Sequence, residues 1–447
     1  MASTVLTRTP SSNGSQRIMT FSTWLKRGDL GISNAFFSTG SNSSNVFAIY
    51  FTSEFASGKA DSLQMEYYNG STNYYIRTNR KFRDTSAWYH IVGVLDTTDA
   101  TQSNRMRLYV NNLEETSFDA SAYPTQNFDV QYLNSTSYQN NVGNYVGGSY
   151  FGGSLAHTHF IDGTVYSPSD FGETDATTGI WKPKTAPSVT YGTNGFFLKF
   201  ENSGAFGTDS SGNANNFTVN GTMTQTIDTP SNVFSTLNPL SRNAGTFANG
   251  NTSQTGGNDI ASTIGVTTGK WYWEVKRANS TNSFHTGICN TNKGMSGASE
   301  QFLNGEANSI GGAIYINESS TGTLSYSNGA GFSSVTYNSF GTVSISSGDI
   351  LGFALDLDSA TKRLDVYQNG SSIGNVTFSY DEQNPIFVYS RMNTGVTADF
   401  NFGNGYFGTT AVASAQNPDD GIGIFEYSVP TGYKALCTKS INAQEYD

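Results

Sequence analysis

Five tyrosines lie in one stretch of the chain that is otherwise rich in neutral polar residues. Between Asp119 and Tyr150 these rings are interspersed with Asn, Gln, Ser and Gly; they are Tyr123, Tyr132, Tyr138, Tyr145 and Tyr150. Sugar-binding sites stack an aromatic ring on the apolar face of a pyranose and hydrogen-bond its hydroxyls with amides and backbone groups. The stretch therefore predicts a glycan-contacting loop, although aromatic residues at alternate strand positions commonly pack across strands instead.

Groups that could hydrolyse a bond are scarce in the sequence. Glu173 and Asp175 stand two residues apart, so on a strand they would point to the same side, as the acid and the nucleophile of a glycosidase must. They follow Ser-Pro-Ser-Asp-Phe-Gly at 167–172, which indicates a loop instead of a strand. With four histidines and no Gly-x-Ser-x-Gly motif, a nucleophilic triad is equally unsupported. We therefore expect a protein that is not an enzyme.

A histidine pair raises the question of a metal. His157 and His159 would share one face of a strand, but a zinc site needs a third ligand and no nearby cluster supplies it. We expect both to be polar residues of a strand face.

The composition narrows the class of protein. Charged residues make up 13% of the chain, against a usual share of about 25%. The net charge of −11 leaves no cationic surplus for binding nucleic acid. No run of 18 apolar residues predicts a membrane span, and the N-terminus lacks the pattern of a secretory signal. Two cysteines, Cys289 and Cys437, do not make a disulfide framework.

The elements that must carry these residues are strands. Short runs with a period of two, such as Lys270–Val275, alternate with turn residues, and we find no long helical period. Asn-Gly pairs, the strongest short hairpin signal, begin at Asn13, Asn69, Asn194, Asn220, Asn249, Asn304, Asn328, Asn369 and Asn404. We predict an all-β fold of two antiparallel, jelly-roll-like β-sandwiches in series. The expected segments are a sandwich over 1–203, a linker or extended strand-and-loop connection over 204–257, a second sandwich over 258–405 and a docked tail over 406–447.

The first segment resembles the laminin-G-like and concanavalin-A-like jelly rolls. The similarity rests on residues 19–24 (Met-Thr-Phe-Ser-Thr-Trp), 87–94, 107–112 and the returning strand at 156–163. Glucanases of that kind carry Glu-x-Asp-x-x-Glu on a strand, and here Thr178 replaces the third carboxylate. Laminin-G-like domains often bind calcium at the sandwich rim. The resemblance therefore implies possible calcium ligands at Asp96, Asp99 and Asp162.

The second segment resembles the SPRY domain. Its residues 269–275 (Gly-Lys-Trp-Tyr-Trp-Glu-Val) and 348–370 match the opening strand and the signature hairpin of that family. SPRY loops bind peptides or other partners, and a loop on a rigid sandwich is where recognition usually lies. The resemblance thus implies a second contact surface in the Gly-rich stretch with Tyr326, Phe332 and Tyr337.

The whole arrangement, with the opening at Leu6–Pro10 and the tail motif at 430–437, resembles structural proteins of tailed, especially marine, bacteriophages. The resemblance implies a virion surface protein, made in the host cytoplasm. We expect it to recognise host cell-surface glycans as a tail fibre or similar component, and a homo-oligomer such as a trimer is one expected state. One alternative is a capsid-decorating or architectural protein that binds other virion proteins. A second is a polysaccharide depolymerase, for which no carboxylate pair is evident.

Overall fold

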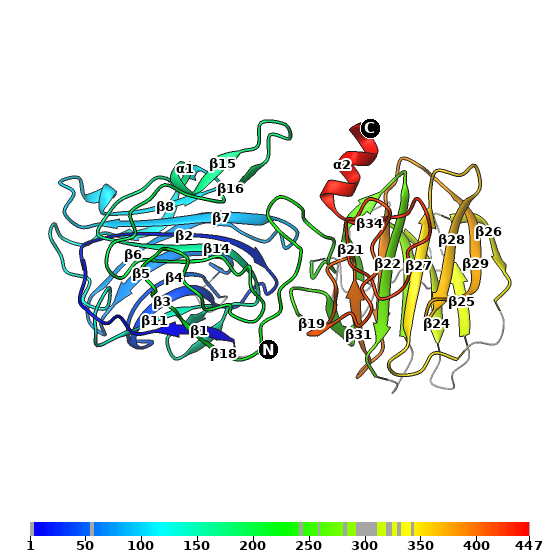
Figure 1. Ribbon diagram of the computed structural model, residues 1–447, viewed down its shortest axis with the longest axis horizontal. Coiled ribbons are helices and arrows are strands. Elements are labelled where there is room, and N and C mark those ends of the chain that lie inside the picture. The colour runs from blue at the N-terminus through cyan, green and yellow to red at the C-terminus, as the bar shows by residue number, and fades with distance from the viewer. Residues whose placement is uncertain are drawn as a thin grey trace. The chain divides into compact units, whose positions relative to one another are not determined.

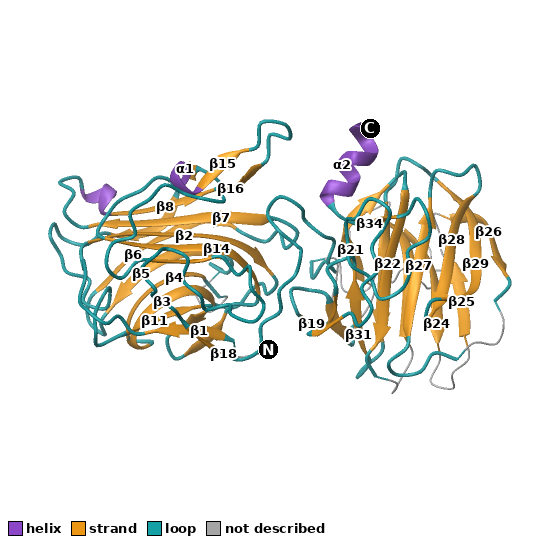
Figure 2. Ribbon diagram, viewed as in Figure 1, coloured by secondary structure: helices purple, strands orange, loops and turns teal. Residues whose placement is uncertain are grey.

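The protein folds into two compact units, Met1–Gln225 and Thr226–Asp447 (Figure 1). The structure is a computed structural model that describes residues 4–53, 58–240, 245–257, 260–279, 284–291, 311–318, 324–328, 332–340 and 344–446. Strands make up nearly all of the regular structure (Figure 2). Within the described ranges, no helix has the length and apolar character needed to cross a membrane.

The first unit consists of two antiparallel sheets and small additions. The eight-stranded sheet has the order β10 (Phe118–Ala122), β6 (Asn73–Lys81), β5 (Ser62–Tyr68), β4 (Asn45–Phe51), β3 (Asn34–Asn42), β11 (Gln139–Val142), β1 (Val5–Arg8), β18 (Thr218–Asn220). The six-stranded sheet has the order β17 (Phe196–Leu198), β14 (Gly153–Asp162), β2 (Ile18–Arg27), β7 (Trp88–Asp96), β8 (Met106–Val110), β9 (Leu113–Glu114). Outside them are β12 (Asn144–Tyr145) with β13 (Gly148–Tyr150), β15 (Gly172–Thr174) with β16 (Trp181–Pro183), α1 (Pro168–Phe171) and a 3-10 turn, η2 (Gln102–Arg105).

The core of the first unit lies between these two sheets. Alternate residues of a strand point to opposite faces, so Phe21 of β2 and Phe37 of β3 both point inward and stack with ring centroids 4.8 Å apart. Gly93 of β7 lies so close to Ile49 of β4 that a Cβ atom there would come within 2.8 Å of the Ile49 side chain. The apolar period seen in the sequence thus closes the sandwich.

The second unit repeats the plan with different strands. One sheet runs β19 (Thr246–Ala248), β20 (Ser253–Thr255), β31 (Thr397–Asn401), β22 (Lys270–Arg277), β27 (Ile350–Asp356), β28 (Lys362–Gln368), β29 (Ser371–Tyr380), β26 (Phe332–Asn338), with β34 (Lys434–Ala435) added to β22. The other runs β21 (Ile260–Val266), β30 (Ile386–Met392), β23 (Phe284–Thr291), β24 (Gly311–Glu318), β25 (Leu324–Asn328). A small hairpin, β32 (Tyr406–Phe407) with β33 (Thr410–Ala411), and α2 (Thr438–Tyr446) complete it.

The predicted fold class is confirmed: both units are β-sandwiches built from antiparallel sheets. One short strand, β34, instead runs parallel to its neighbour β22. In the second core, Trp273 of β22 stacks on Phe353 of β27 with centroids 5.4 Å apart. Ile288 of β23 is buried in the same cluster and comes from the other sheet.

The stretch expected to be a linker or extended connection, 204–257, is divided between the two units. Residues 218–220 form β18 and pair with β1 of the first sheet, while Phe217 packs on Phe196 with ring centroids 4.6 Å apart. Residues 246–255 form β19 and β20 at the edge of the second unit's larger sheet. A short edge strand is held by backbone pairing and needs no apolar run, so this stretch contains strands although its sequence has no long apolar run.

The C-terminal segment packs on the second unit. Phe425 meets the Tyr272 ring edge-on with centroids 5.0 Å apart, and Ala435 and Cys437 are buried in the same apolar cluster. The Glu274 carboxylate, which is 0% exposed, accepts the backbone N–H groups of Glu426 and Tyr427 at 2.9 Å each.

Turn chemistry follows the sequence at several hairpins. Asn111 and Asn112, which join β8 to β9, have φ of +50° and +69°, a conformation that Asn tolerates better than most residues. Asn369 and Gly370, with φ of +48° and +79°, join β28 to β29 in the same way.

Candidate functional site

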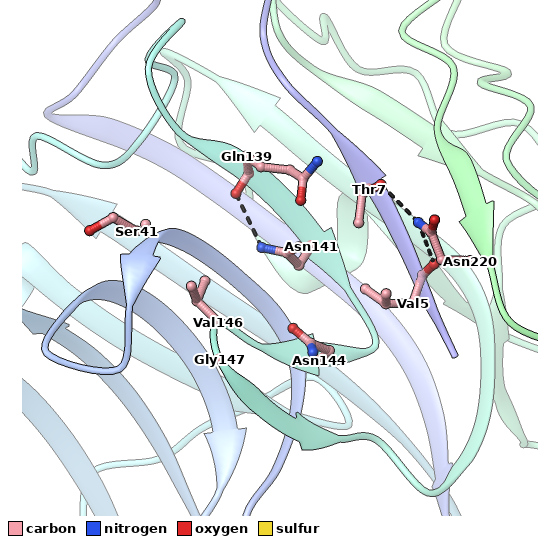
Figure 3. A pocket seen from close by; sticks show the side chains of 10 residues that line it. Val5, Thr7, Ser41, Gln139, Asn141, Asn144, Val146, Gly147 and Asn220 are labelled. Atoms are coloured by element: carbon pink, nitrogen blue, oxygen red, sulfur yellow. Dashed lines mark hydrogen bonds between the residues drawn. The ribbon is translucent and has the colours of Figure 1, made fainter. Parts of the chain in front are cut away.

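A hollow of about 430 Å³ opens on the outer face of the eight-stranded sheet in the first unit. This volume is in the range of small-ligand sites, about 300–1,000 Å³. Leu6 and Val142 point into the core, so their neighbours along β1 and β11 point outward. The lining residues are Val5, Thr7, Gly40, Ser41, Gln139, Asn141, Asn144, Val146, Gly147 and Asn220 (Figure 3).

The polar groups of the hollow are neutral and partly fixed by one another. The Asn220 amide donates to the Thr7 hydroxyl at 3.0 Å, which ties the edge strand β18 to β1 (Figure 3). The Asn141 amide donates to the Gln139 carbonyl oxygen at 3.2 Å. None of the described lining residues carries a charge. Amides and hydroxyls in this arrangement can donate to and accept from the hydroxyl groups of a neutral ligand.

The β12–β13 hairpin forms one wall of the hollow. It lies over β3, where the Ser38 hydroxyl donates to the Asn144 carbonyl oxygen at 2.8 Å. Asn144 and Val146 line the hollow. Tyr145, between them, instead meets the Tyr50 ring of β4 edge-on, with centroids 5.3 Å apart.

A charged network occupies the same sheet beyond that wall. The Tyr50 hydroxyl donates to Glu66 at 2.6 Å and accepts from the Gln64 amide at 2.7 Å. Burial, together with the Glu66 charge, raises the pKa of Tyr50 well above its ordinary value, so this hydroxyl remains a donor.

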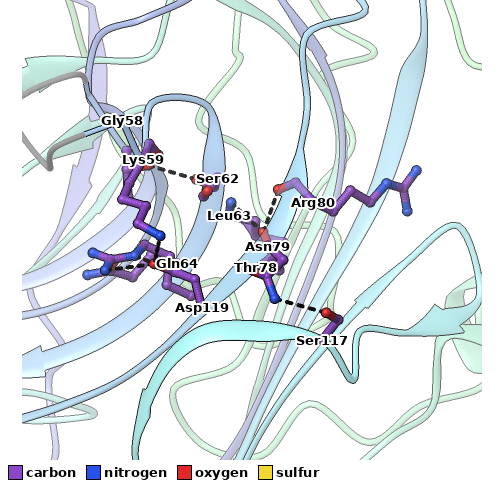
Figure 4. A network of polar contacts seen from close by, with 12 residues as sticks. Gly58, Lys59, Ser62, Leu63, Gln64, Thr78, Asn79, Arg80, Ser117 and Asp119 are labelled. Carbon is purple, nitrogen blue, oxygen red and sulfur yellow. Dashed lines mark hydrogen bonds and ion pairs between the residues drawn. The ribbon is translucent and has the colours of Figure 1, made fainter.

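At the end of this network, Asp119 forms ion pairs with two basic side chains. It pairs with Lys59 at 2.7 Å (Figure 4). It also pairs with Arg77 at 2.9 Å. Burial alone would raise the pKa of Asp119, but the hydrogen bonds from Arg77 and Lys59 outweigh it and lower the pKa below its ordinary value. The Glu66 and Asp119 carboxylates are thus engaged by neighbours, and neither is set up as a glycosidase acid.

The five tyrosines of the predicted glycan loop do not form one site. Tyr132 is 1% exposed and stacks on Tyr67 in the core, with Tyr138 packed against it edge-on. Ligand contact through Tyr132 is therefore a wrong prediction: the loop folds inward and its rings fill space below the sheet. Tyr123 also packs against that core.

The other two tyrosines lie beside the hollow. Tyr145 and Tyr150 are half-buried members of the β12–β13 hairpin, and neither lines the hollow. Both tyrosines belong to the wall of the hollow but do not contact its interior.

The three aspartates expected as calcium ligands bind the protein itself. Asp162 accepts hydrogen bonds from the Ser15 and Asn194 backbone N–H groups and from the Asn134 amide, at 2.8–3.1 Å. Asp96 and Asp99 accept from Thr98 and Thr101 N–H in their own loop. Among the described residues, no group of three or more His, Cys, Asp or Glu side chains could hold a metal ion.

Asp175 and His159, which the sequence raised as candidates for catalysis and metal binding, also interact with other groups of the protein. Asp175 lies in the loop after β15, where it caps Thr177 and Thr178 N–H and pairs with Lys182 at 2.6 Å. His159 stacks on Phe197 with centroids 3.9 Å apart, and burial holds its pKa well below the ordinary value.

His157 occupies the adjoining part of β14. Burial lowers the pKa of its imidazole, so it too is neutral near pH 7.

The predicted contact surface of the second unit is only partly described. Phe332 is buried and packs on Phe378 edge-on at 5.4 Å, so it is not available to a partner. Tyr337 is half-buried next to Phe340. The side chain of Tyr326 lies outside the described residues.

Sequence reasoning missed the residues that line the hollow. Gln139, Asn141 and Asn144 lie within the tyrosine-rich stretch, in which the aromatic rings are the stronger sequence signal for sugar binding. The alternation that ends in buried Val142 was the available signal for Gln139 and Asn141. Nothing local in the sequence links Asn220 to Thr7, because their contact depends on the pairing of β18 with β1.

Comparison with known families bears on the first unit. Residues 3–170 match the concanavalin A-like lectin/glucanases superfamily, through its Laminin_G_3 family. The match includes β1, β3 and the β12–β13 hairpin, and ends before β18. No curated protein matches the sequence.

Solved structures show distant similarity to parts or most of the chain. A pentraxin of Limulus polyphemus is 17% identical over 37% of this chain and 73% of its own, with a TM-score of 0.27. The PSpry domain of TRIM65 is 14% identical over 37% and 91%, with a TM-score of 0.26. Domains LG4-5 of mouse laminin alpha1 are 9% identical over 97% and 85%, with a TM-score of 0.28.

Proposed function

We propose that this protein binds neutral glycans in the hollow of its first unit, and that it does so as a non-enzymatic surface component of a bacteriophage virion, a tail fibre or similar structure, that recognises its host. The observation that carries the glycan proposal is the chemistry of the hollow. Amides and hydroxyls line it without a charge, and Val5 and Val146 add small apolar surfaces.

The match of residues 3–170 to a superfamily of lectins and glucanases supports the same ligand class. The Glu66 carboxylate accepts a hydrogen bond from Tyr50, and the Asp119 carboxylate pairs with Arg77. Because both carboxylates already have partners, this face favours binding over hydrolysis. The virion role rests on the resemblance of the sequence to phage structural proteins. An architectural role in the virion would require binding to other virion proteins and none to glycans.

The test uses the full-length protein against immobilised neutral polysaccharides (mannan, dextran and galactan), the acidic polysaccharide alginate, and intact bacteria of candidate host strains. Ser41→Trp is the informative variant, because Ser41 is exposed at the hollow and an indole there fills it. Gln102→Ala, which removes an exposed amide in η2, is the matched control.

We expect saturable binding to a neutral polysaccharide or to a host strain, lost in Ser41→Trp and kept in Gln102→Ala, with an unchanged melting temperature. Absence of binding to every polysaccharide and strain would reject the glycan proposal. Binding that Ser41→Trp leaves intact would reject the hollow as the site. Shortened polysaccharide chains after incubation would show a depolymerase instead.

A further inference from the structure

The two faces of the β12–β13 hairpin have different neighbours, and this difference suggests how the hollow is shaped. We propose that Tyr145 and Tyr50 are positioning residues that set the glycan selectivity of the hollow, by fixing the hairpin that forms its wall. This inference rests on the proposed function. Neither ring lines the hollow, so both would act only through the hairpin.

The base of the hairpin is fixed by hydrogen bonds. Ser38 donates to the Asn144 carbonyl oxygen at 2.8 Å, and the Asn34 amide donates to the Tyr150 carbonyl oxygen at 3.2 Å. Phe151 N–H, just after the hairpin, donates to the Gly143 carbonyl oxygen at 2.9 Å. These contacts hold both ends of the hairpin against β3.

The tip depends on a side chain. Val146 and Gly147 make the turn, and Gly147 has a φ of +93°, which favours glycine. Just before the turn, Tyr145 contacts Tyr50 edge-on, an arrangement that aromatic pairs favour. The Tyr145 ring therefore connects the tip of the wall to β4.

Tyr50 is itself held rigidly. Its hydroxyl is bound to both Glu66 and Gln64, and those two side chains are buried on β5. The Gln64 amide also donates to Glu66 at 3.1 Å, which closes the triangle. Through Tyr50, the position of the wall thus depends on β5, the strand next to β4 in the sheet.

Sugars that differ in one hydroxyl are told apart by hydrogen bonds that tolerate displacements of only about 0.5 Å. Asn144 and Val146 flank Tyr145 in the chain and line the hollow. Loss of the Tyr145 ring frees the tip, so Val146 shifts, while Asn144, whose carbonyl oxygen is held by Ser38, and the floor of the hollow stay in place. We therefore expect a change in which glycan is preferred, beyond a general loss of binding.

The experiment uses the full-length protein with Tyr145→Ala, Tyr50→Phe and the control Tyr109→Ala. Tyr50→Phe keeps the ring and removes the hydroxyl bound by Glu66 and Gln64. Tyr109 is a half-buried tyrosine of β8, on the other sheet. Two readouts are made: relative affinities for mannan, dextran and galactan, and hydrogen–deuterium exchange of residues 143–151 without glycan.

We expect Tyr145→Ala to alter the order of preference among the three polysaccharides and to speed exchange in 143–151. Tyr50→Phe should do the same to a smaller extent, and Tyr109→Ala should do neither. Unchanged exchange in 143–151, or faster exchange with an unchanged order of preference, would overturn the inference. Failure of the proposed function would look different, since the unsubstituted protein would then bind none of the polysaccharides.

Discussion

Tyr145 stands edge-on to Tyr50, with ring centroids 5.3 Å apart and ring planes at 76°. This contact lies on the boundary between two kinds of surface on one sheet. On one side lie Tyr50, Glu66 and the ion pairs of Asp119; on the other lies a hollow lined by neutral amides and hydroxyls. The hairpin that carries Tyr145 separates them, so a neutral ligand can be bound close to charged groups without contacting them.

A charge placed in the hollow should weaken glycan binding. Asn220→Asp removes the donor to the Thr7 hydroxyl and places a carboxylate near the Val5 carbonyl oxygen, which the Asn220 amide now meets at 3.4 Å. We expect affinity for the best neutral polysaccharide to fall by about tenfold, or about 1.4 kcal/mol. Asn202→Asp is the control, since Asn202 is exposed and its side-chain oxygen, which Asp retains, accepts the Gly204 N–H. Equal affinity in both variants would contradict the site.

Glu274 should make the stability of the second unit depend on pH. Burial raises its pKa to about 7 from an ordinary 4.5, although hydrogen bonds from the Glu426 and Tyr427 backbones, Asn401 and Tyr272 act in the lowering direction. The folded protein therefore keeps a proton that the unfolded chain releases. The free energy of unfolding from this group is highest below pH 4.5 and falls by about 3 kcal/mol as the pH rises to about 7.

Glu274→Gln removes this titration and is the variant for the measurement. Chemical denaturation of both proteins from pH 4.5 to pH 8 gives the difference in their stability at each pH. We expect that difference to change through the pH 4.5–7 window, with the variant showing the flatter profile. Parallel profiles would show that Glu274 has no raised pKa.

The sandwich core of the first unit should tolerate truncation poorly. Phe21→Ala removes a fully buried ring that stacks on Phe37, and such changes cost about 3–5 kcal/mol. Leu113, 70% exposed in β9, provides the control: Leu113→Ala should change the free energy of unfolding by less than about 0.5 kcal/mol. Urea denaturation measures both, and similar values for the two variants would argue against the packing described for Phe21.

Metal removal should have no effect on the first unit. The Asp162 carboxylate is occupied by three donors, and Asp96 and Asp99 bind N–H groups of their own loop. We expect the same melting temperature with EDTA and with added calcium. A melting temperature that drops with EDTA and recovers with calcium would contradict this expectation and support calcium binding at these aspartates.

The fold class could be predicted from the sequence because its signals are local. A period of two places residues such as Phe21 and Leu25 on one face, and Asn-Gly pairs such as Asn369–Gly370 mark hairpins directly. The strand at 218–220 could not be predicted, because its three residues are exposed and too few to show a period of two, and only pairing with β1 makes them a strand.

The candidate site could be predicted only in part, because its residues come from distant parts of the chain. The tyrosine-rich stretch does contain Gln139, Asn141 and Asn144, but whether each ring faces outward depends on the path of the loop. Tyr132, like Tyr145, follows an amide residue and precedes an aliphatic one, yet it is buried against Tyr67. Thr7 and Asn220 meet through strand order, which the sequence pattern does not specify.

The central claim, that a neutral glycan binds in the hollow of the first unit, is tested most directly by crystallography. Crystals of the full-length protein would be soaked with oligosaccharides of the polysaccharide that binds best. We predict sugar density in contact with Gln139, Asn141, Asn144 and Asn220, with its nearest apolar contact at Val146. Density at any other place on the protein, with an empty hollow, would contradict the account.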